Sequence, residues 1–283
     1  MKHKFLFGVV GHRISYSQSP QIFEVIAREL NLAHSFVLHD LEPSEFDEKF
    51  PRVLKSGIDG FSVTIPHKNR VVPHLDRIDP SAALVGAVNS VGIKDGQATG
   101  FNTDGDGFAV PLDEHRDGLK GGKALIFGAG GAATAVIHCL HARFGTSKFY
   151  VLGRDPERLS RFAAMCKQGT PQIDLDTLTI SEYAAIRDED FSIVVNCTPL
   201  GGWNHPEESP LPGEFVWLPG RIYYDLSYND ANRIVAQARE HSMIAYDGSA
   251  MLVGQALKSF NLWTGYSVAF DIVYRAVFAN RRS

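Results

Sequence analysis

Cysteine, long apolar runs and an excess of charge of one sign are all scarce in this sequence. Its three cysteines are odd in number and widely spaced, which favours a reducing, cytoplasmic location over a disulfide framework. No run of about 18 apolar residues occurs, so we expect no membrane-spanning helix. The net charge of −4 gives no reason to expect nucleic acid or an anionic membrane as a partner.

Metal-binding patterns are missing as well. None of the eleven histidines stands with cysteine or another histidine at a zinc-like spacing, and His138 and His141 are more typical of one face of a helix. The opening MKHKFLFGVVGHR has a very short apolar stretch, which favours a first strand over a signal peptide. The 283 residues suffice for one large domain or two ordinary ones. We therefore expect a metal-free enzyme or binding protein.

Short apolar runs alternate with amphipathic stretches in the first part of the chain. In chain order the pattern predicts a strand, a helix with Ser19 as its N-cap, a strand, a helix and a strand, over residues 5–11, 19–32, 34–41, 43–57 and 60–65. This βαβαβ order indicates a parallel or mixed sheet covered by helices.

A second series follows a break near residues 111–122, which are rich in charge, proline and glycine. The expected strands are 123–128, 148–153, 192–198, 221–228 and 245–248, with helices near 131–143 and 155–167. Two further helices, 250–265 and 268–280, are expected to return to the first domain. The predicted fold is thus α/β, with one domain over residues 1–110 and 250–283 and a Rossmann-type domain over residues 111–249.

The stretch ALIFGAGGAATAVIHCL (residues 124–140) carries a dinucleotide-binding pattern. Gly128 permits a tight turn, Gly130 lets backbone approach a pyrophosphate, and the small Ala133 permits close packing of helix on strand. The N-terminus of the following helix would present free N–H groups to the phosphates. Because strand, glycine turn, helix and next strand all stand in order, we favour cofactor binding over a merely structural turn.

The end of the next strand bears on the choice between NAD and NADP. An NAD site usually carries an acid there, about 20 residues beyond the glycines, but Gly153 and Arg154 occupy this place. Arg158 lies one helical turn further, and two guanidinium groups suit a 2′-phosphate. Asp155 argues the other way, and the charges could also form a solvated helix start. NADP is favoured, with NAD possible.

Two short polar stretches indicate a reacting site. Lys68 follows the apolar run in FSVTIPHKN (61–69), and Asp104 lies in GFNTDGDG (100–107). A lysine past a strand of an α/β sheet stands at the carboxyl end, where such folds bind ligands, and a loop carboxylate could hold its ammonium in place. An acid–base pair facing a substrate is one reading; a salt bridge on the rim is the other. The residues alone leave both open.

Together the motifs closely resemble those of the shikimate dehydrogenase family, and they span nearly the whole chain. They are SYSQSP, SVTIPHK, GAVNS, GFNTDGDG, GAGGAA, NCTPLG, DLSYN and DGSAMLVGQA, in the family's order. The resemblance implies NADP-dependent reversible reduction of 3-dehydroshikimate to shikimate, in aromatic amino-acid biosynthesis. It also implies two α/β domains with the active site in the cleft between them.

The resemblance also implies roles for single residues. The catalytic pair would be Lys68 and Asp104. Substrate contacts would come from Ser17 and Ser19, which would bind its carboxylate, and from Thr64, Asn89, Tyr228 and Gln255. At ~100° per residue, Gln255 lies about 120° from the apolar stripe of its helix, as expected of a ligand contact or of a solvated side chain. Positions around NADP would be Gly128, Ala129, Gly130, Gly131, Ala132, Arg154, Arg158, Leu226 and Gly248.

Some positions depart from the family pattern, among them Ser62 and Asp155, and leave room for other readings. One alternative is a quinate/shikimate dehydrogenase paralogue using NAD or NADP. Another is a non-catalytic sensor of a cyclic acid and a dinucleotide, although retention of Lys68 and Asp104 argues against it. The expected partner is a small cyclic hydroxy acid, and the expected state is a monomer or homodimer.

Overall fold

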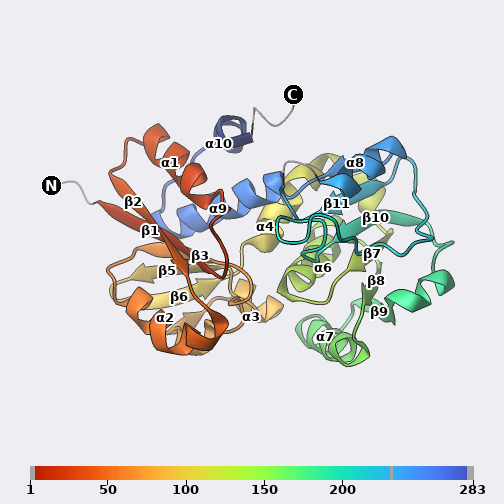
Figure 1. The fold of residues 1–283 in the computed structure, drawn as a ribbon, viewed down its shortest axis with the longest axis horizontal. Helices are drawn as coiled ribbons and strands as arrows, with labels where there is room; N and C mark the ends of the chain where they lie inside the picture. The colour runs from red at the N-terminus through yellow and green to blue at the C-terminus, as the bar shows by residue number, and fades with distance from the viewer. Residues whose placement is uncertain (1–3, 230–231, 279–283) are drawn as a thin grey trace. The chain divides into compact units, whose positions relative to one another are not determined.

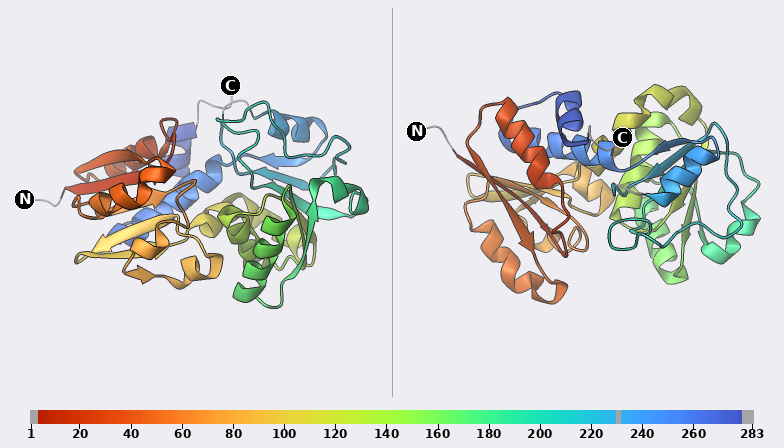
Figure 2. Two further views of the ribbon diagram at one scale, coloured as in Figure 1. Left: turned by 60° about the horizontal axis from the view of Figure 1, so that its bottom comes forward. Right: turned by 45° about the horizontal axis from the view of Figure 1, so that its top comes forward.

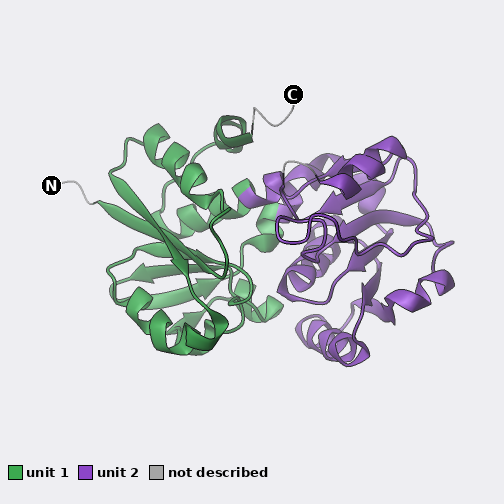
Figure 3. Ribbon diagram, viewed as in Figure 1, with its two compact units in different colours: residues 1–107, 253–283 green, residues 108–252 purple. Residues whose placement is uncertain are grey.

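The chain forms two compact units. The computed structural model describes residues 4–229 and 232–278. Within them, unit 1 joins the chain up to Gly107 to the part from Val253 onward, and unit 2 comprises Phe108–Leu252 (Figure 3). The chain passes from one unit to the other within α4 (Asp104–Ala109) and again within α9 (Ser249–Thr264).

The described part of unit 1 contains a six-stranded mixed sheet in the order β2-β1-β3-β5-β6-β4. Parallel pairs join β1 to β2, β1 to β3 and β4 to β6, whereas β5 is antiparallel to both β3 and β6. The strands are β1 (Phe5–Gly11), β2 (His34–Asp40), β3 (Gly60–Val63), β4 (Arg77–Ile78), β5 (Ser90–Lys94) and β6 (Gln97–Phe101).

Helices cover both faces of this sheet (Figures 1 and 2). One face carries α1 (Ser19–Glu29), α9 and α10 (Phe270–Phe278); the other carries η1 (Pro43–Glu45), α2 (Phe46–Leu54), η2 (Val72–His74) and α3 (Pro80–Val85). Trp263 of α9 lies directly on the sheet, because a Cβ at Gly60 would come within 2.3 Å of its indole. The indole nitrogen donates to Ser90 Oγ at 3.0 Å. The C-terminal helices therefore return to the first unit, as predicted.

Unit 2 contains a parallel sheet in the order β9-β8-β7-β10-β11-β12. This is the strand order of a dinucleotide-binding Rossmann fold, so the predicted fold class is confirmed. The strands are β7 (Lys123–Phe127), β8 (Lys148–Gly153), β9 (Asp174–Thr179), β10 (Phe191–Asn196), β11 (Ile222–Asp225) and β12 (Ile244–Tyr246). The helices are η3 (Val110–His115), α5 (Arg116–Leu119), α6 (Gly131–Phe144), α7 (Pro156–Gly169), η4 (Ile180–Ala185) and α8 (Arg233–Glu240).

Two apolar clusters fix the layers of unit 2. On one face, α6 and α7 pack on the sheet through residues such as Val136, Leu140 and Phe162. On the other face, Ile234 and Val235 of α8 pack with Tyr183 of η4. No helix within residues 4–229 and 232–278 is long and apolar enough to cross a membrane.

Several predicted bounds were wrong. The first helix starts at Ser19, so Gln18 is its N-cap and Ser19 is already helical. The strand expected over 60–65 ends at Val63, and a turn begins at Ile65. The helix expected over 268–280 spans 270–278, and the last two residues of that prediction lie outside the described ones.

Other elements were not predicted: β4, α3, β5, β6, α4, α5, β9, α8 and the 3-10 helices η2, η3 and η4. The strands among them lack continuous apolar runs, as in QATGF of β6 and DLDTLT of β9. Pairing with neighbouring strands, which a local pattern does not reveal, holds them in the sheet.

Candidate active site

Lys68 and Asp104 form an ion pair in unit 1. Lys68 Nζ lies 2.5 Å from Asp104 Oδ2, and the side chains are 18% and 5% exposed. Lys68 stands in the turn after β3 and accepts the Val88 N–H at its carbonyl, at 2.8 Å. Asp104 is the first residue of α4 rather than a loop residue as expected. Such burial speaks against a salt bridge on the rim, because a rim pair would be open to solvent.

A hydrogen-bond network extends from this pair through two other predicted site residues. Asp104 Oδ1 accepts from Asn89 Nδ2 at 2.8 Å. Asn89 Nδ2 also lies 3.4 Å from Gln255 Oε1. The sequence left open whether Gln255 is a ligand contact or a solvated side chain. Gln255 is only 8% exposed, so it is not solvated. The fold thus brings Lys68, Asp104, Asn89 and Gln255 into one group.

Ser17 and Ser19 form a second group at the start of α1. Ser17 Oγ lies 3.2 Å from Ser19 Oγ, and the Ser19 N–H donates to Ser17 Oγ at 3.3 Å. Asp40, at the end of β2, steadies the preceding loop by accepting the Arg13 N–H at 2.8 Å. Thr64, half-buried just past β3, donates its N–H to the Val10 carbonyl at 2.9 Å. Two hydroxyl groups at a helix N-terminus suit an anion.

The glycine turn of unit 2 has the geometry that a phosphate site needs. Gly128 has φ +102°, and a Cβ there would come within 3.0 Å of Thr198. Gly130 is the N-cap of α6, with Gly131 and Ala132 in its first turn. Arg158 Nε donates to the Ala129 carbonyl at 3.1 Å. Bare backbone at a helix N-terminus, next to a guanidinium, fits a dinucleotide phosphate.

Asp155 has a structural role that the sequence reading did not assign. It is the N-cap of α7, and its Oδ1 accepts the N–H groups of Glu157 and Arg158 at 2.9 and 3.2 Å. Ser, Thr, Asp and Asn are the preferred residues at this position. Its presence beside the exposed Arg154 is therefore explained without any ribose contact.

Leu226 and Gly248 meet where β11 and β12 end. A Cβ at Gly248 would lie 2.1 Å from the Leu226 carbonyl oxygen, so only glycine allows this approach. The Leu226 N–H donates to the Asn196 carbonyl at 3.0 Å. Tyr228 follows in the same segment and is half-buried. These residues and Gly128 stand at the carboxyl ends of parallel strands, the edge at which such sheets bind ligands.

A buried polar pair behind these segments escaped the sequence reading. Asn196 Nδ2 donates to Asp225 Oδ2 and to the Leu200 carbonyl, each at 2.9 Å. Asp225 Oδ1 accepts the Ser227 N–H at 2.9 Å. Both side chains are fully buried, and they tie together the segments that follow β10 and β11. The available signal was a polar residue ending each of two apolar strands, SIVVN and IYYD.

Asp225 should make the unfolding free energy depend on pH. Burial raises the pKa of this carboxyl above 3.8, against the opposing effect of the Asn196 and Ser227 hydrogen bonds. Asp225 therefore keeps its proton to higher pH in the folded state than in the unfolded state. The protonated carboxyl stabilises the folded state at low pH, and this contribution is lost as pH rises through the raised pKa. In urea titrations, the unfolding free energy of the wild type minus that of Asp225→Asn should fall as pH rises from 3.8. A rising difference would contradict the assignment.

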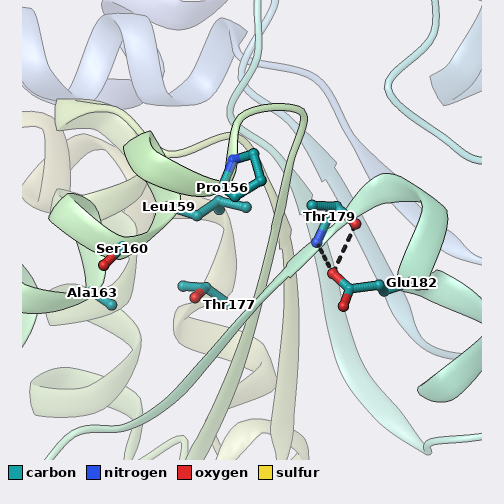
Figure 4. Close-up of a pocket in the computed structure, with 7 residues that line it drawn as sticks. All are labelled: Pro156, Leu159, Ser160, Ala163, Thr177, Thr179 and Glu182. Atoms are coloured by element: carbon teal, nitrogen blue, oxygen red, sulfur yellow. Dashed lines mark hydrogen bonds between the residues drawn. The ribbon is translucent and has the colours of Figure 1, made fainter.

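A hollow lies between α7 and β9 in unit 2 (Figure 4). Its lining residues are Pro156, Leu159, Ser160, Ala163, Thr177, Thr179 and Glu182. Glu182 is engaged locally, because its carboxylate accepts from the Thr179 N–H and hydroxyl, both at 2.7 Å. No predicted site residue lines this hollow. Within residues 4–229 and 232–278, no group of three acidic, His or Cys side chains could hold a metal ion.

Known proteins match the chain over almost its whole length. The sequence model of the shikimate dehydrogenase substrate binding domain matches residues 9–91. A protein of Nitrosopumilus maritimus named shikimate dehydrogenase (NADP(+)) is 34% identical over 272 residues, 96% of this chain and 97% of the relative. This chain belongs to the shikimate dehydrogenase family.

Solved structures of similar proteins share the fold. Shikimate 5-dehydrogenase of Thermus thermophilus, solved with NADP(H) and shikimate, is 29% identical, with a TM-score of 0.81 over 97% of this chain and 99% of that chain. Quinate dehydrogenase of Corynebacterium glutamicum, solved with NAD, is 25% identical, with a TM-score of 0.84 over 98% and 100% of the two chains. The family predicted from the motifs is thus confirmed.

Proposed function

We propose that this chain is an NADP-dependent shikimate dehydrogenase, which reversibly reduces 3-dehydroshikimate to shikimate. The observation that carries the proposal is the partly buried Lys68–Asp104 pair in a chain that is 34% identical to a shikimate dehydrogenase over nearly its full length. Unit 1 would be the substrate-binding and catalytic domain, and unit 2 the dinucleotide-binding domain.

The two residues of the pair would divide the proton chemistry. When bound, the nicotinamide supplies or accepts the hydride at the ring carbon that bears the reacting oxygen. Lys68 would take the proton from that oxygen during oxidation and return it during reduction. Asp104, 2.5 Å away, would hold the Lys68 ammonium in position. This placement raises the effective concentration of the acid–base group.

The remaining polar groups of unit 1 suit a small cyclic hydroxy acid. The hydroxyl groups of Ser17 and Ser19 would bind the carboxylate, aided by the N-terminus of α1. The amides of Asn89 and Gln255 carry both donors and acceptors and would bind ring hydroxyl groups. Thr64 would complete the contacts from unit 1, and Tyr228, which belongs to unit 2, is a further predicted substrate contact. The cytoplasmic location and the monomeric or homodimeric state remain predictions.

The residues of unit 2 fit NADP. The glycine turn and the start of α6 would hold the pyrophosphate, with Leu226 and Gly248 at neighbouring strand ends. Arg154 and Arg158 would bind the 2′-phosphate. Asp155 is accounted for as the N-cap of α7, with its Oδ1 accepting two N–H groups of that helix, rather than as a ligand of the ribose 2′-hydroxyl.

Rate measurements would test the proposed function. Shikimate and quinate are each incubated with NADP⁺ and with NAD⁺, and reduced nicotinamide is followed by absorbance. We expect the highest kcat/KM for shikimate with NADP⁺. Faster turnover of quinate would favour the paralogue, a reading supported by the similar fold of a quinate dehydrogenase. Binding of a cyclic acid without turnover in any combination would favour the sensor.

The two arginines should differ in their effects. Arg154→Ala should raise the KM for NADP⁺ by about tenfold or more and leave that for NAD⁺ nearly unchanged, because an arginine–phosphate hydrogen bond is charge-assisted. Arg158→Ala should weaken both cofactors, since Arg158 also bonds to the Ala129 carbonyl of the glycine turn. Steady-state kinetics with both cofactors measure this. An unchanged NADP⁺/NAD⁺ ratio in Arg154→Ala would remove the basis for the cofactor assignment.

A further inference from the structure

Thr103 is buried between the predicted site residues, and neither the motifs nor the family comparison gives it a role. The residue is 1% exposed, and it directly precedes Asp104. It contacts Asn89, Gln255 and Ser259 through hydrogen bonds. It therefore joins the segment before β5, the start of α4 and helix α9.

The backbone of Thr103 fixes the orientation of the Asn89 amide. Its N–H donates to Asn89 Oδ1 at 2.7 Å, which turns Asn89 Nδ2 towards Asp104 Oδ1 at 2.8 Å. If the amide were reversed, its oxygen would face the carboxylate and its NH₂ would face the Thr103 N–H. Both contacts would be repulsive, so only one orientation is stable.

The hydroxyl of Thr103 connects this amide to α9. It accepts from Asn89 Nδ2 at 3.0 Å and donates to the Gln255 carbonyl at 3.1 Å. Ser259 Oγ, also at 3.1 Å, can donate to it in turn. The hydroxyl has one hydrogen. Of the two oxygens that can only accept it, the Gln255 carbonyl at 3.1 Å is nearer than Asn89 Oδ1 at 3.3 Å, whereas Ser259 can act as either partner.

We propose that Thr103 is a positioning residue for recognition of the ring hydroxyl groups. It holds the Asn89 amide against Asp104 and sets the place of Gln255 on α9, although it need not touch the substrate itself. This inference rests on the proposed function, since it assumes that Asn89 and Gln255 bind a cyclic hydroxy acid.

Thr103→Val and Thr103→Ser form a matched test. Valine keeps the shape and the backbone N–H but leaves the Gln255 carbonyl without the hydroxyl donor. We expect kcat/KM for shikimate to fall about tenfold to a hundredfold, as for loss of buried hydrogen bonds. The Kd of NADP⁺, measured by fluorescence titration, should stay within about twofold, since its proposed ligands lie in unit 2. Thr103→Ser, which restores the hydroxyl, should recover most of the activity.

A structural control separates positioning from general destabilisation. Phe50→Leu, at a buried position of α2 in the unit 1 core, should lower Tm as large-to-small core changes do, with kcat/KM for shikimate kept. The inference is overturned if Thr103→Val retains the kcat/KM of the wild type, or if Thr103→Ser does not restore it. It is also overturned if Phe50→Leu, at the same Tm as Thr103→Val, shows an equal loss of kcat/KM. If the wild type neither binds nor oxidises a cyclic hydroxy acid, the proposed function fails, and this inference fails with it.

Discussion

Lys68→Ala should lose most of kcat, about 10²- to 10⁴-fold, the usual contribution of a general acid–base group. The Lys68 side chain is 18% exposed and its ammonium is paired with the carboxylate of Asp104, whose side chain is 5% exposed, and water cannot replace a group held in that position. The substitution should change the Kd of NADP⁺ little, because the proposed cofactor ligands lie in unit 2. Stopped-flow turnover and fluorescence titration of the cofactor measure the two quantities.

Lys49→Ala is the matched control. Lys49 also lies 2.5 Å from a carboxylate, that of Glu45, but both side chains are more than 40% exposed. Such exposed pairs contribute about 0–1 kcal/mol, so kcat and stability should stay near those of the wild type. Equal losses in kcat and in cofactor affinity for Lys68→Ala would contradict the role assigned to Lys68.

Gly248→Ala should disrupt the cofactor side of unit 2 although it adds only one methyl group. The added Cβ would lie 2.1 Å from the Leu226 carbonyl oxygen, a backbone atom that cannot move as a flexible side chain does. The two strand-end segments must separate, at a cost of about 1–3 kcal/mol or more. We expect a lower urea midpoint. We also expect the KM for NADP⁺ to rise about tenfold, because displacement of these segments would misplace the groups that bind the cofactor.

Gly213→Ala provides the comparison within the same unit. A Cβ at Gly213 meets nothing within 4 Å, and its φ is not positive, so this variant should resemble the wild type in both measurements. If Gly248→Ala bound NADP⁺ as tightly as Gly213→Ala does, the segment holding Leu226 and Gly248 would not belong to the cofactor site.

The sequence predicted the elements whose signals are local. Apolar runs marked β1, β2, β3, β7, β8 and β10, and the glycine turn between β7 and α6 identified the Rossmann-type unit. The edge strand β9 and the short β4, β5 and β6 have no apolar run that marks them. They form by pairing with neighbouring strands, and a local pattern in the sequence does not reveal such pairing. The roles of Asp155 as an N-cap and of Asn196 and Asp225 as a buried pair required the three-dimensional contacts.

For the site, the sequence by itself determined which residue types were available: a lysine past a strand, a carboxylate in a turn-rich stretch and two serines before a helix. Only the tertiary structure decided which of them meet. Lys68 and Asp104 are 36 positions apart, and Asn89 and Gln255 are 166 apart. The contacts of Trp263 with Gly60 and Ser90 pack α9 on the sheet and bring Gln255 to Asn89. Burial of apolar surface between distant segments drives such packing, and local patterns in the sequence do not encode it.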